Sequence, residues 1–199
     1  MFELKICGIK DEDNAQHISA LNVDYLGLIF AKSPREVSRE KAKNIAQIVH
    51  RNGKKIVGVF VEKTLDCILE TVDFVELDGV QIYKKINKNE FESLKALGIF
   101  VWQVISVGEN LEFPQELYAD MVLFDTKGKF QGGNGISFNW QLLTSYKKDF
   151  ILAGGIGLDN IKEALKFKPK IIDINSKVEN EQGLKDEEKI RQILKEIGK

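Results

Sequence analysis

The chain has 199 residues, of which 43 % are hydrophobic, and its 29 basic and 30 acidic side chains leave a net charge of -1. This balance gives no electrostatic reason to expect nucleic acid or an anionic membrane as a partner, and no apolar run approaches the roughly 18 residues that a membrane-spanning helix needs. The first residues lack the basic leader and apolar core of a secretory signal. We therefore expect a soluble cytoplasmic protein with one domain over residues 1–199.

Short strand-like runs alternate with helical patterns along the chain. The runs that predict strands are 4–7, 25–30, 55–61, 79–83, 99–107, 120–125, 150–153 and 170–174. Helical segments are predicted at 11–21, 42–49, 65–72, 90–97, 139–143, 161–165 and 190–197, most of them from apolar residues three and four positions apart. The element after the fifth strand is weak, with only Pro114 and a short segment at 115–118 to mark it.

Eight strands that alternate with helices predict a parallel sheet with right-handed crossovers. Eight such units close naturally into a (β/α)8 TIM barrel, and the short chain implies short loops. A doubly wound open sheet is the alternative, but that architecture usually has fewer strands. The predicted fold class is therefore a single-domain α/β barrel.

In a barrel of this kind, functional residues lie at the C-terminal ends of the strands. Reactive and anion-binding residue types gather at these ends, at Cys7, Arg35, Gln81, Asp125, Gly154, Gly155, Asn175 and Ser176. The predicted helices carry little that is comparable. Both histidines, His17 and His50, fall on helices, where they are expected to be peripheral. The charged run at 179–189 is expected to be a solvated loop and helix start.

Two of these strand ends are suited to a phosphate group. Gly154 and Gly155 lead from the seventh strand towards a helix, and Asn175 and Ser176 follow the eighth. Backbone N–H groups at such turns can bind phosphate. The loops after strands 7 and 8 are the usual place for this site in barrels, so we expect phosphate here.

Cys7 ends the first strand and is followed by Gly8, a residue that allows a ligand or another chain segment to approach closely. Lys5 lies two residues earlier, on the same face of the strand. Because the eighth strand adjoins the first in a barrel, Asp173 is placed to neutralise Lys5 in the interior. A cation beside Cys7 favours its thiolate, whereas a cysteine without such a neighbour is usually an inert buried side chain.

Asp125 and Arg35 are the other two candidates for chemistry. A carboxyl group at the end of the apolar run 121–125 is costly unless it is paired or used, although it could also cap a loop. Arg35 follows the rigid Ser33-Pro34 pair. Its guanidinium group is suited to a substrate carboxylate, and a surface arginine near a helix start is the alternative.

Together these motifs resemble those of the phosphoribosylanthranilate isomerases, barrel enzymes of tryptophan biosynthesis. The resemblance covers nearly the whole chain, and the stretches around Cys7 and Asp125 are its most specific parts. The matching stretches are Lys5-Ile6-Cys7-Gly8-Ile9, Ser33-Pro34-Arg35-Glu36-Val37-Ser38, Val57-Gly58-Val59-Phe60-Val61, Gly79-Val80-Gln81-Ile82, Phe124-Asp125-Thr126, Gly132-Gly133-Asn134-Gly135, Phe138-Asn139-Trp140 and Leu152-Ala153-Gly154-Gly155.

The resemblance implies an Amadori rearrangement of a phosphosugar, with Cys7 as general base and Asp125 as general acid. It further implies that Arg35 holds the anthranilate carboxylate and that the last two strand ends hold the phosphate. An acid and a base suffice for this reaction, so neither a metal nor another cofactor is expected. The small-molecule substrate is the expected partner, and monomer and homodimer remain open.

This chain departs from the family pattern at three places. Tyr83 stands in Ile82-Tyr83-Lys84 where the family usually has Leu-His-Gly, and Asn134 replaces a threonine. After the eighth strand, Asn175-Ser176-Lys177 replaces Ser-Ser-Gly. The last departure lies at the expected phosphate site.

Two other functions remain open at this stage. A ribulose-phosphate 3-epimerase would use acidic pairs and histidine metal ligands at strand ends, but both histidines are predicted on helices. A metabolite-binding barrel without turnover would keep the phosphate site, but Cys7 and Asp125 would then have no role. A metal analysis tests the first alternative, and a turnover assay tests the second.

Overall fold

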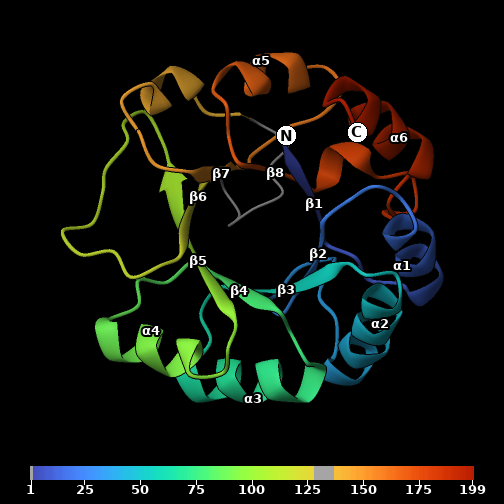
Figure 1. The fold of residues 1–199 in the computed structure, drawn as a ribbon, viewed down its shortest axis with the longest axis horizontal. Coiled ribbons are helices and arrows are strands. Elements are labelled where there is room, and N and C mark those ends of the chain that lie inside the picture. Colours follow the sequence, from blue (N-terminus) through green and yellow to red (C-terminus); the bar gives the residue numbers. More distant parts are fainter. Residues whose placement is uncertain (1, 128–136) are drawn as a thin grey trace.

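The eight strands close into a barrel. The computed structural model describes residues 2–127 and 137–199, and its parallel strands pair in sequence order from β1 to β8, with β8 returning to β1 (Figure 1). The strands are β1 (Glu3–Cys7), β2 (Tyr25–Ile29), β3 (Lys55–Phe60), β4 (Gly79–Ile82), β5 (Phe100–Val107), β6 (Met121–Thr126), β7 (Phe150–Leu152) and β8 (Ile171–Ile174). This arrangement confirms the predicted barrel, including all eight strands.

Helices surround the barrel on its outer side (Figure 1). They are α1 (Glu12–Ser19), α2 (Arg39–Arg51), α3 (Leu65–Val75), α4 (Lys88–Lys95), α5 (Ile161–Lys166) and α6 (Glu187–Glu196). All except α5 begin after a residue whose side chain accepts a hydrogen bond from a backbone N–H of the first turn; these capping residues are Asp11, Ser38, Thr64, Asn87 and Asp186. Such caps satisfy N–H groups that the helix itself leaves without partners.

The helical ring is less regular than the sequence predicts. Residues 108–120, all of which the structure describes, form no helix between β5 and β6. Leu111 and Phe113 of this segment pack on the barrel instead, and the Phe113 ring lies 6.0 Å from that of Phe124. The segment predicted at 139–143 is a short 3-10 helix, η1 (Trp140–Leu143), and a second one, η2 (Ser176–Val178), follows β8.

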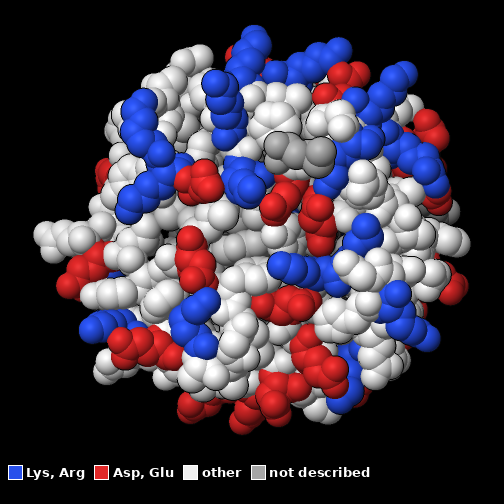
Figure 2. Space-filling view, in the orientation of Figure 1, with Lys and Arg blue, Asp and Glu red and all other residues white. Residues whose placement is uncertain are grey.

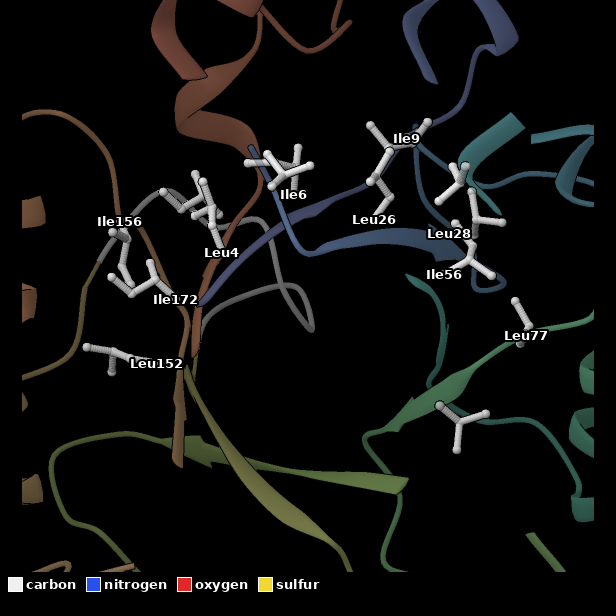
Figure 3. Packing of buried hydrophobic residues seen from close by; sticks show 14 of the residues in the cluster. Leu4, Ile6, Ile9, Leu26, Leu28, Ile56, Leu77, Leu152, Ile156 and Ile172 are labelled. Carbon is white, nitrogen blue, oxygen red and sulfur yellow. The ribbon is translucent and has the colours of Figure 1, made fainter. Parts of the chain in front are cut away.

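Successive strand residues face opposite sides of the barrel wall, as the two-residue period of a strand requires. Leu4, Leu152 and Ile172 face outward from the neighbouring strands β1, β7 and β8 and pack together beneath the helices (Figure 3). Leu123 and Ile151 belong to a separate cluster inside the barrel. Because both faces are buried, the strands appear as nearly continuous apolar runs.

Three aspartates join strands at the N-terminal end of the barrel. Asp24, Asp78 and Asp120 each come directly before an even-numbered strand, β2, β4 or β6. Each carboxylate accepts a 2.7 Å hydrogen bond from a backbone N–H near the start of the preceding strand, donated by Leu4, Ile56 and Val101 respectively. This end of the barrel thus uses its carboxylates to hold strands together, as is usual for the face opposite the active site.

Acidic and basic side chains are interspersed over the face of the molecule seen in Figure 2. This mixture agrees with a sequence in which the two signs nearly cancel. Among the residues that the structure describes, every helix is too short or too polar to cross a membrane.

Candidate active site

A cavity of about 750 Å³ opens at the C-terminal ends of the strands. Every residue predicted for the site contributes to its lining, namely Cys7, Arg35, Gln81, Asp125, Gly154, Gly155, Asn175 and Ser176. Tyr83, Asp173 and Lys177 also line it. The barrel therefore brings residues that are spread over most of the chain together around one cavity.

Asp125 sits at the C-terminal end of β6 and is only 4 % exposed. Its Oδ1 accepts a 2.8 Å hydrogen bond from the Thr126 backbone N–H, and its Oδ2 accepts a 2.7 Å hydrogen bond from the Tyr83 hydroxyl. Burial raises the pKa of Asp125 to about 6, although the hydrogen bond from Tyr83 opposes that rise. A carboxyl group with this pKa can exchange a proton near neutral pH.

Cys7 lies at the end of β1, separated from Asp125 by β7 and β8 around the barrel. Beneath it, the Lys5 ammonium group donates to Asp173 Oδ2 at 2.8 Å and to Gln81 Oε1 at 2.9 Å. The predicted pair of Lys5 and Asp173 is thus confirmed, and it is fully buried inside the barrel. Gln81, one of the residues predicted for the site, accepts the second of these hydrogen bonds through its side-chain carbonyl oxygen and so holds Lys5.

Lys5 acts on Cys7 in the predicted direction, since its charge and hydrogen bond lower the pKa of the thiol, but burial outweighs it. Burial raises the pKa of the Cys7 thiol above its ordinary value, and this effect exceeds the opposing attraction of Lys5. Asp173, which pairs with Lys5, adds to the effect of burial because its negative charge further disfavours the thiolate. In the resting protein, Cys7 is therefore a thiol at neutral pH while Asp125 is mainly ionised.

Two glycines make room for the acid and the base. A Cβ on Gly27 of β2 would lie 2.9 Å from the Cys7 sulfur, and a Cβ on Gly154 would lie 2.2 Å from the Thr126 hydroxyl oxygen. Gly154 also has a φ of +88°, which disfavours any residue with a side chain. Gly154 thus lets the loop after β7 approach the end of β6, next to Asp125.

Arg35 reaches the cavity from the loop after β2, where its guanidinium group is held by Glu179. Nε and Nη2 of Arg35 donate to the two carboxylate oxygens of Glu179 at 2.6 and 2.7 Å. This hydrogen bonding raises the pKa of Arg35. The contact occupies one edge of the guanidinium group, and the edge formed by its two terminal nitrogens can still bind a second carboxylate.

The expected solvation of residues 179–189 is wrong for Lys185, which is 3 % exposed. Its ammonium group donates to Glu179 at 2.7 Å and to the Asn175 side-chain oxygen at 2.8 Å. Burial lowers the pKa of Lys185 to about 8, although Glu179 counteracts this shift. Charge alone marks these residues in the sequence, and it cannot distinguish a buried pair from a solvated one.

Gly8 has a φ of +78°, and two side chains fill the space above it. The Arg35 Cδ and the Asn175 side-chain oxygen lie 2.7 and 2.8 Å from where its Cβ would be. Gly8 thus lets the Arg35 and Asn175 side chains pack over the end of β1.

The end of the cavity expected to hold phosphate is formed by the segments after β7 and β8. Gly155 has a φ of +65°, and Ser176 begins η2 directly after β8. The Lys177 ammonium group lies 3.1 Å from Asp159 Oδ2 in an exposed ion pair. Lys177 thus has an acidic partner on the surface beside the cavity.

The remaining sequence predictions concern the motif at 132–135, the two histidines and a possible metal site. The motif at 132–135, with its departure at Asn134, lies outside the described residues. His17 and His50 are on α1 and α2, as predicted. Within the described ranges, no three His, Cys, Asp or Glu side chains are grouped so that they could hold a metal ion.

Comparisons with known proteins agree with this geometry. A family model described as N-(5'phosphoribosyl)anthranilate (PRA) isomerase matches residues 4–196. The crystal structure of phosphoribosyl anthranilate isomerase from Thermus thermophilus has a TM-score of 0.86 and 26 % identity, covering 99 % of this chain and 98 % of that one. A second, phosphoribosyl anthranilate isomerase in complex with reduced 1-(o-carboxyphenylamino)-1-deoxyribulose 5-phosphate, has a TM-score of 0.78 and 25 % identity, with 100 % of both chains covered.

A relative from Campylobacter jejuni, an N-(5'-phosphoribosyl)anthranilate isomerase, gives the stronger sequence match. It is 59 % identical over 199 residues, which cover 100 % of both chains. The similarity therefore extends over every strand of the barrel and both segments expected to bind phosphate. On this evidence, the chain belongs to the phosphoribosylanthranilate isomerase family.

Proposed function

We propose that the protein converts N-(5-phosphoribosyl)anthranilate to 1-(2-carboxyphenylamino)-1-deoxyribulose 5-phosphate, with Asp125 as general acid and Cys7 as general base. The observation that carries the proposal is the presence of a buried carboxyl group and a buried thiol on the lining of one cavity, in a member of this family. The similarity to a structure that contains a reduced form of the product supports the substrate class.

The reaction begins with two proton transfers to and from side chains. Asp125 gives a proton to the ring oxygen of the ribose, and the bond from C1′ to that oxygen breaks while the lone pair of the anilino nitrogen forms a C1′=N double bond. Cys7 then takes the proton from C2′; the electron pair of that C–H bond forms a C1′=C2′ double bond, and the electrons of the C1′=N bond return to nitrogen. The resulting enolamine becomes the ketone when C1′ gains a proton and the C2′ hydroxyl loses one. One acid and one base at separate points of the cavity are sufficient for both steps.

In the resting site the proton is on Cys7 and not on Asp125, whereas the proposed reaction needs it on Asp125. The reacting form has a Cys7 thiolate and a protonated Asp125, whereas burial leaves the proton on the thiol at neutral pH. Both forms carry one proton in total, so kcat/KM follows the singly protonated pair. Its acidic limb should therefore lie near the pKa of Asp125, about 6, and its alkaline limb at the pKa of Cys7.

Arg35 is proposed to bind the anthranilate carboxylate through the edge of its guanidinium group that Glu179 does not use. Glu179 would hold that edge towards the cavity before substrate arrives. A bidentate contact between a guanidinium and a carboxylate fixes orientation as well as adding affinity, so this end of the site would align the anthranilate ring.

Gly154, Gly155, Asn175 and Ser176 are proposed to bind the phosphate through backbone and side-chain groups. Lys177→Gly tests whether the adjacent ammonium group takes part. Because Lys177 is paired with Asp159, we expect KM to stay within about threefold of the wild-type value, measured by initial rates over a range of substrate concentrations. A tenfold rise, about 1.4 kcal/mol of lost binding, would instead indicate direct contact with phosphate.

The proposed activity is tested by mixing the purified protein with N-(5-phosphoribosyl)anthranilate and following the loss of substrate fluorescence. We expect multiple turnovers, at a rate that EDTA does not change, because side chains supply both proton transfers. Loss of activity in EDTA and its recovery on adding a divalent metal would favour the epimerase type of chemistry. Substrate binding without turnover would instead identify a metabolite-binding barrel.

A further inference from the structure

Tyr83 occupies a place between the two reactive groups. It follows β4 directly, and its backbone N–H donates to the Phe60 carbonyl oxygen at 3.0 Å, which continues the barrel pairing. Its ring packs against the cluster that contains Cys7 and Val59. From there its hydroxyl group reaches across to Asp125 and donates to Oδ2 at 2.7 Å.

The two oxygens of Asp125 have different surroundings. Oδ1 accepts a hydrogen bond from the Thr126 backbone N–H, a donor that cannot rotate. On its other side, Oδ1 lies 3.1 Å from where a Cβ on Gly154 would be. Oδ2 faces the Tyr83 hydroxyl, which can donate to a carboxylate and can also accept from a carboxylic acid. Oδ2 is therefore the oxygen on which an acidic proton can come and go without losing a hydrogen bond.

We propose that Tyr83 is the positioning residue of Asp125: it fixes Oδ2 at the cavity and stabilises the carboxylate that remains once the proton has left. This inference rests on the proposed role of Asp125 as the acid. The carboxylate must be stabilised at the moment of proton transfer, and a preorganised donor does so without reorganisation. The chain thus uses a phenol at a position where its family usually has a histidine.

The charged and titratable groups around this pair come from two other strands, β1 and β8. Asp173 on β8 opposes ionisation of Asp125, and Lys5 on β1 favours it. Cys7, also on β1, faces Tyr83, and burial together with the nearby Asp125 raises the pKa of the Tyr83 phenol well above its ordinary value. Tyr83 consequently remains a neutral donor throughout the pH range in which Asp125 titrates.

Tyr83→Phe removes the hydroxyl group and keeps the ring. Without that donor the carboxylate of Asp125 is less stable, so its pKa should rise by roughly one unit, a tenfold change in its acid dissociation constant. The acidic limb of kcat/KM should move upward by the same amount. The pKa is measured on the whole protein by an NMR titration of the carboxyl carbons, in which Asp125→Asn identifies the signal of Asp125. The acidic limb is measured from initial rates as a function of pH.

Tyr25→Phe provides a matched control. Tyr25 is also partly buried, and its hydroxyl donates to a carboxylate, Glu3 Oε2, at the same distance of 2.7 Å, but at the opposite end of the barrel. This variant should lose a comparable hydrogen bond while leaving both the pKa of Asp125 and the acidic limb in place. Ionisation of the substrate affects all the variants equally and cancels in the comparison.

The readouts separate the two proposals. An upward shift of both the NMR pKa and the kinetic limb in Tyr83→Phe alone supports the role of Tyr83. An unchanged pKa of Asp125 in Tyr83→Phe overturns that role, even if Asp125→Asn abolishes turnover and the acid assignment stands. If the pKa of Asp125 rises in Tyr83→Phe but the acidic limb of kcat/KM does not move, Asp125 is not the acid. Tyr83 then has no role in catalysis through Asp125.

Discussion

Asp125→Asn is expected to lower kcat by about 10²–10⁴-fold, the usual contribution of a positioned acid or base. Asparagine has nearly the same shape and can still accept the Thr126 N–H through its carbonyl oxygen, but its amide group has no acidic proton to give to the ribose. The measurement is the steady-state rate of substrate fluorescence loss, with circular dichroism to show that the fold is retained.

Cys7→Ala is expected to have an effect of the same size, because alanine cannot accept the C2′ proton. Cys67→Ala is the matched control, since Cys67 lies on α3, away from the cavity lining, and is the other free cysteine. The double variant should lose less than the product of the two single effects, because both groups serve one rearrangement. Near wild-type kcat in either single variant would show that the residue does not have its proposed role.

Lys5→Met is expected to lower the free energy of unfolding by about 3–5 kcal/mol, the usual cost of removing one partner of a buried ion pair. Methionine is of similar length, so the main loss is the ammonium group that holds Asp173 and Gln81 inside the barrel. Asp173 then keeps a buried charge with no cation beside it. Urea denaturation at pH 7 measures the loss.

The pH dependence of this loss gives a check on its cause. Without Lys5, burial would raise the pKa of Asp173 further above its unfolded value. Below the unfolded pKa the carboxyl is neutral in both states, and stability falls as the pH rises towards the folded pKa. The deficit of Lys5→Met should therefore be smaller at pH 5 than at pH 8.

The double variant Lys5→Met/Asp173→Leu separates the missing charge from a packing defect. Replacing both members of a buried pair by apolar side chains is often close to neutral, so it should recover much of the lost stability. If the double variant is as unstable as Lys5→Met and the deficit does not change with pH, the uncompensated charge of Asp173 is not the cause.

The barrel, and the residues that line the cavity at the C-terminal ends of its strands, could be predicted from the sequence. Strands that are buried on both faces appear as short, nearly continuous apolar runs, and this information is local, so eight strands could be located without knowing any contact. The order of the strands around a barrel follows from their order in the chain. For that reason Lys5 and Asp173, on the first and last strands, could be paired from the sequence alone.

The segment between β5 and β6 differs from the regular alternation of strands and helices. The sequence of residues 108–120 contains only a weak helical pattern, and in the structure this segment is irregular, with Leu111 packed on the core and the edge of the half-exposed Phe113 against Phe124. A few well-placed apolar side chains can cover a strand without a helix. The alternation of strands and helices therefore predicts a helix here that the weak local pattern does not support.

The proton affinities and the hydrogen-bond partners of the site residues depend on contacts that form only in the folded protein. Arg35 meets Glu179 from 144 positions away, and Tyr83 meets Asp125 from 42 positions away. Neither contact repeats with any period, so no pattern in the sequence could indicate it. The pKa of Cys7 depends in the same way on how completely the fold removes water from the thiol and how fully Asp173 neutralises Lys5, two effects that exist only once the barrel has closed.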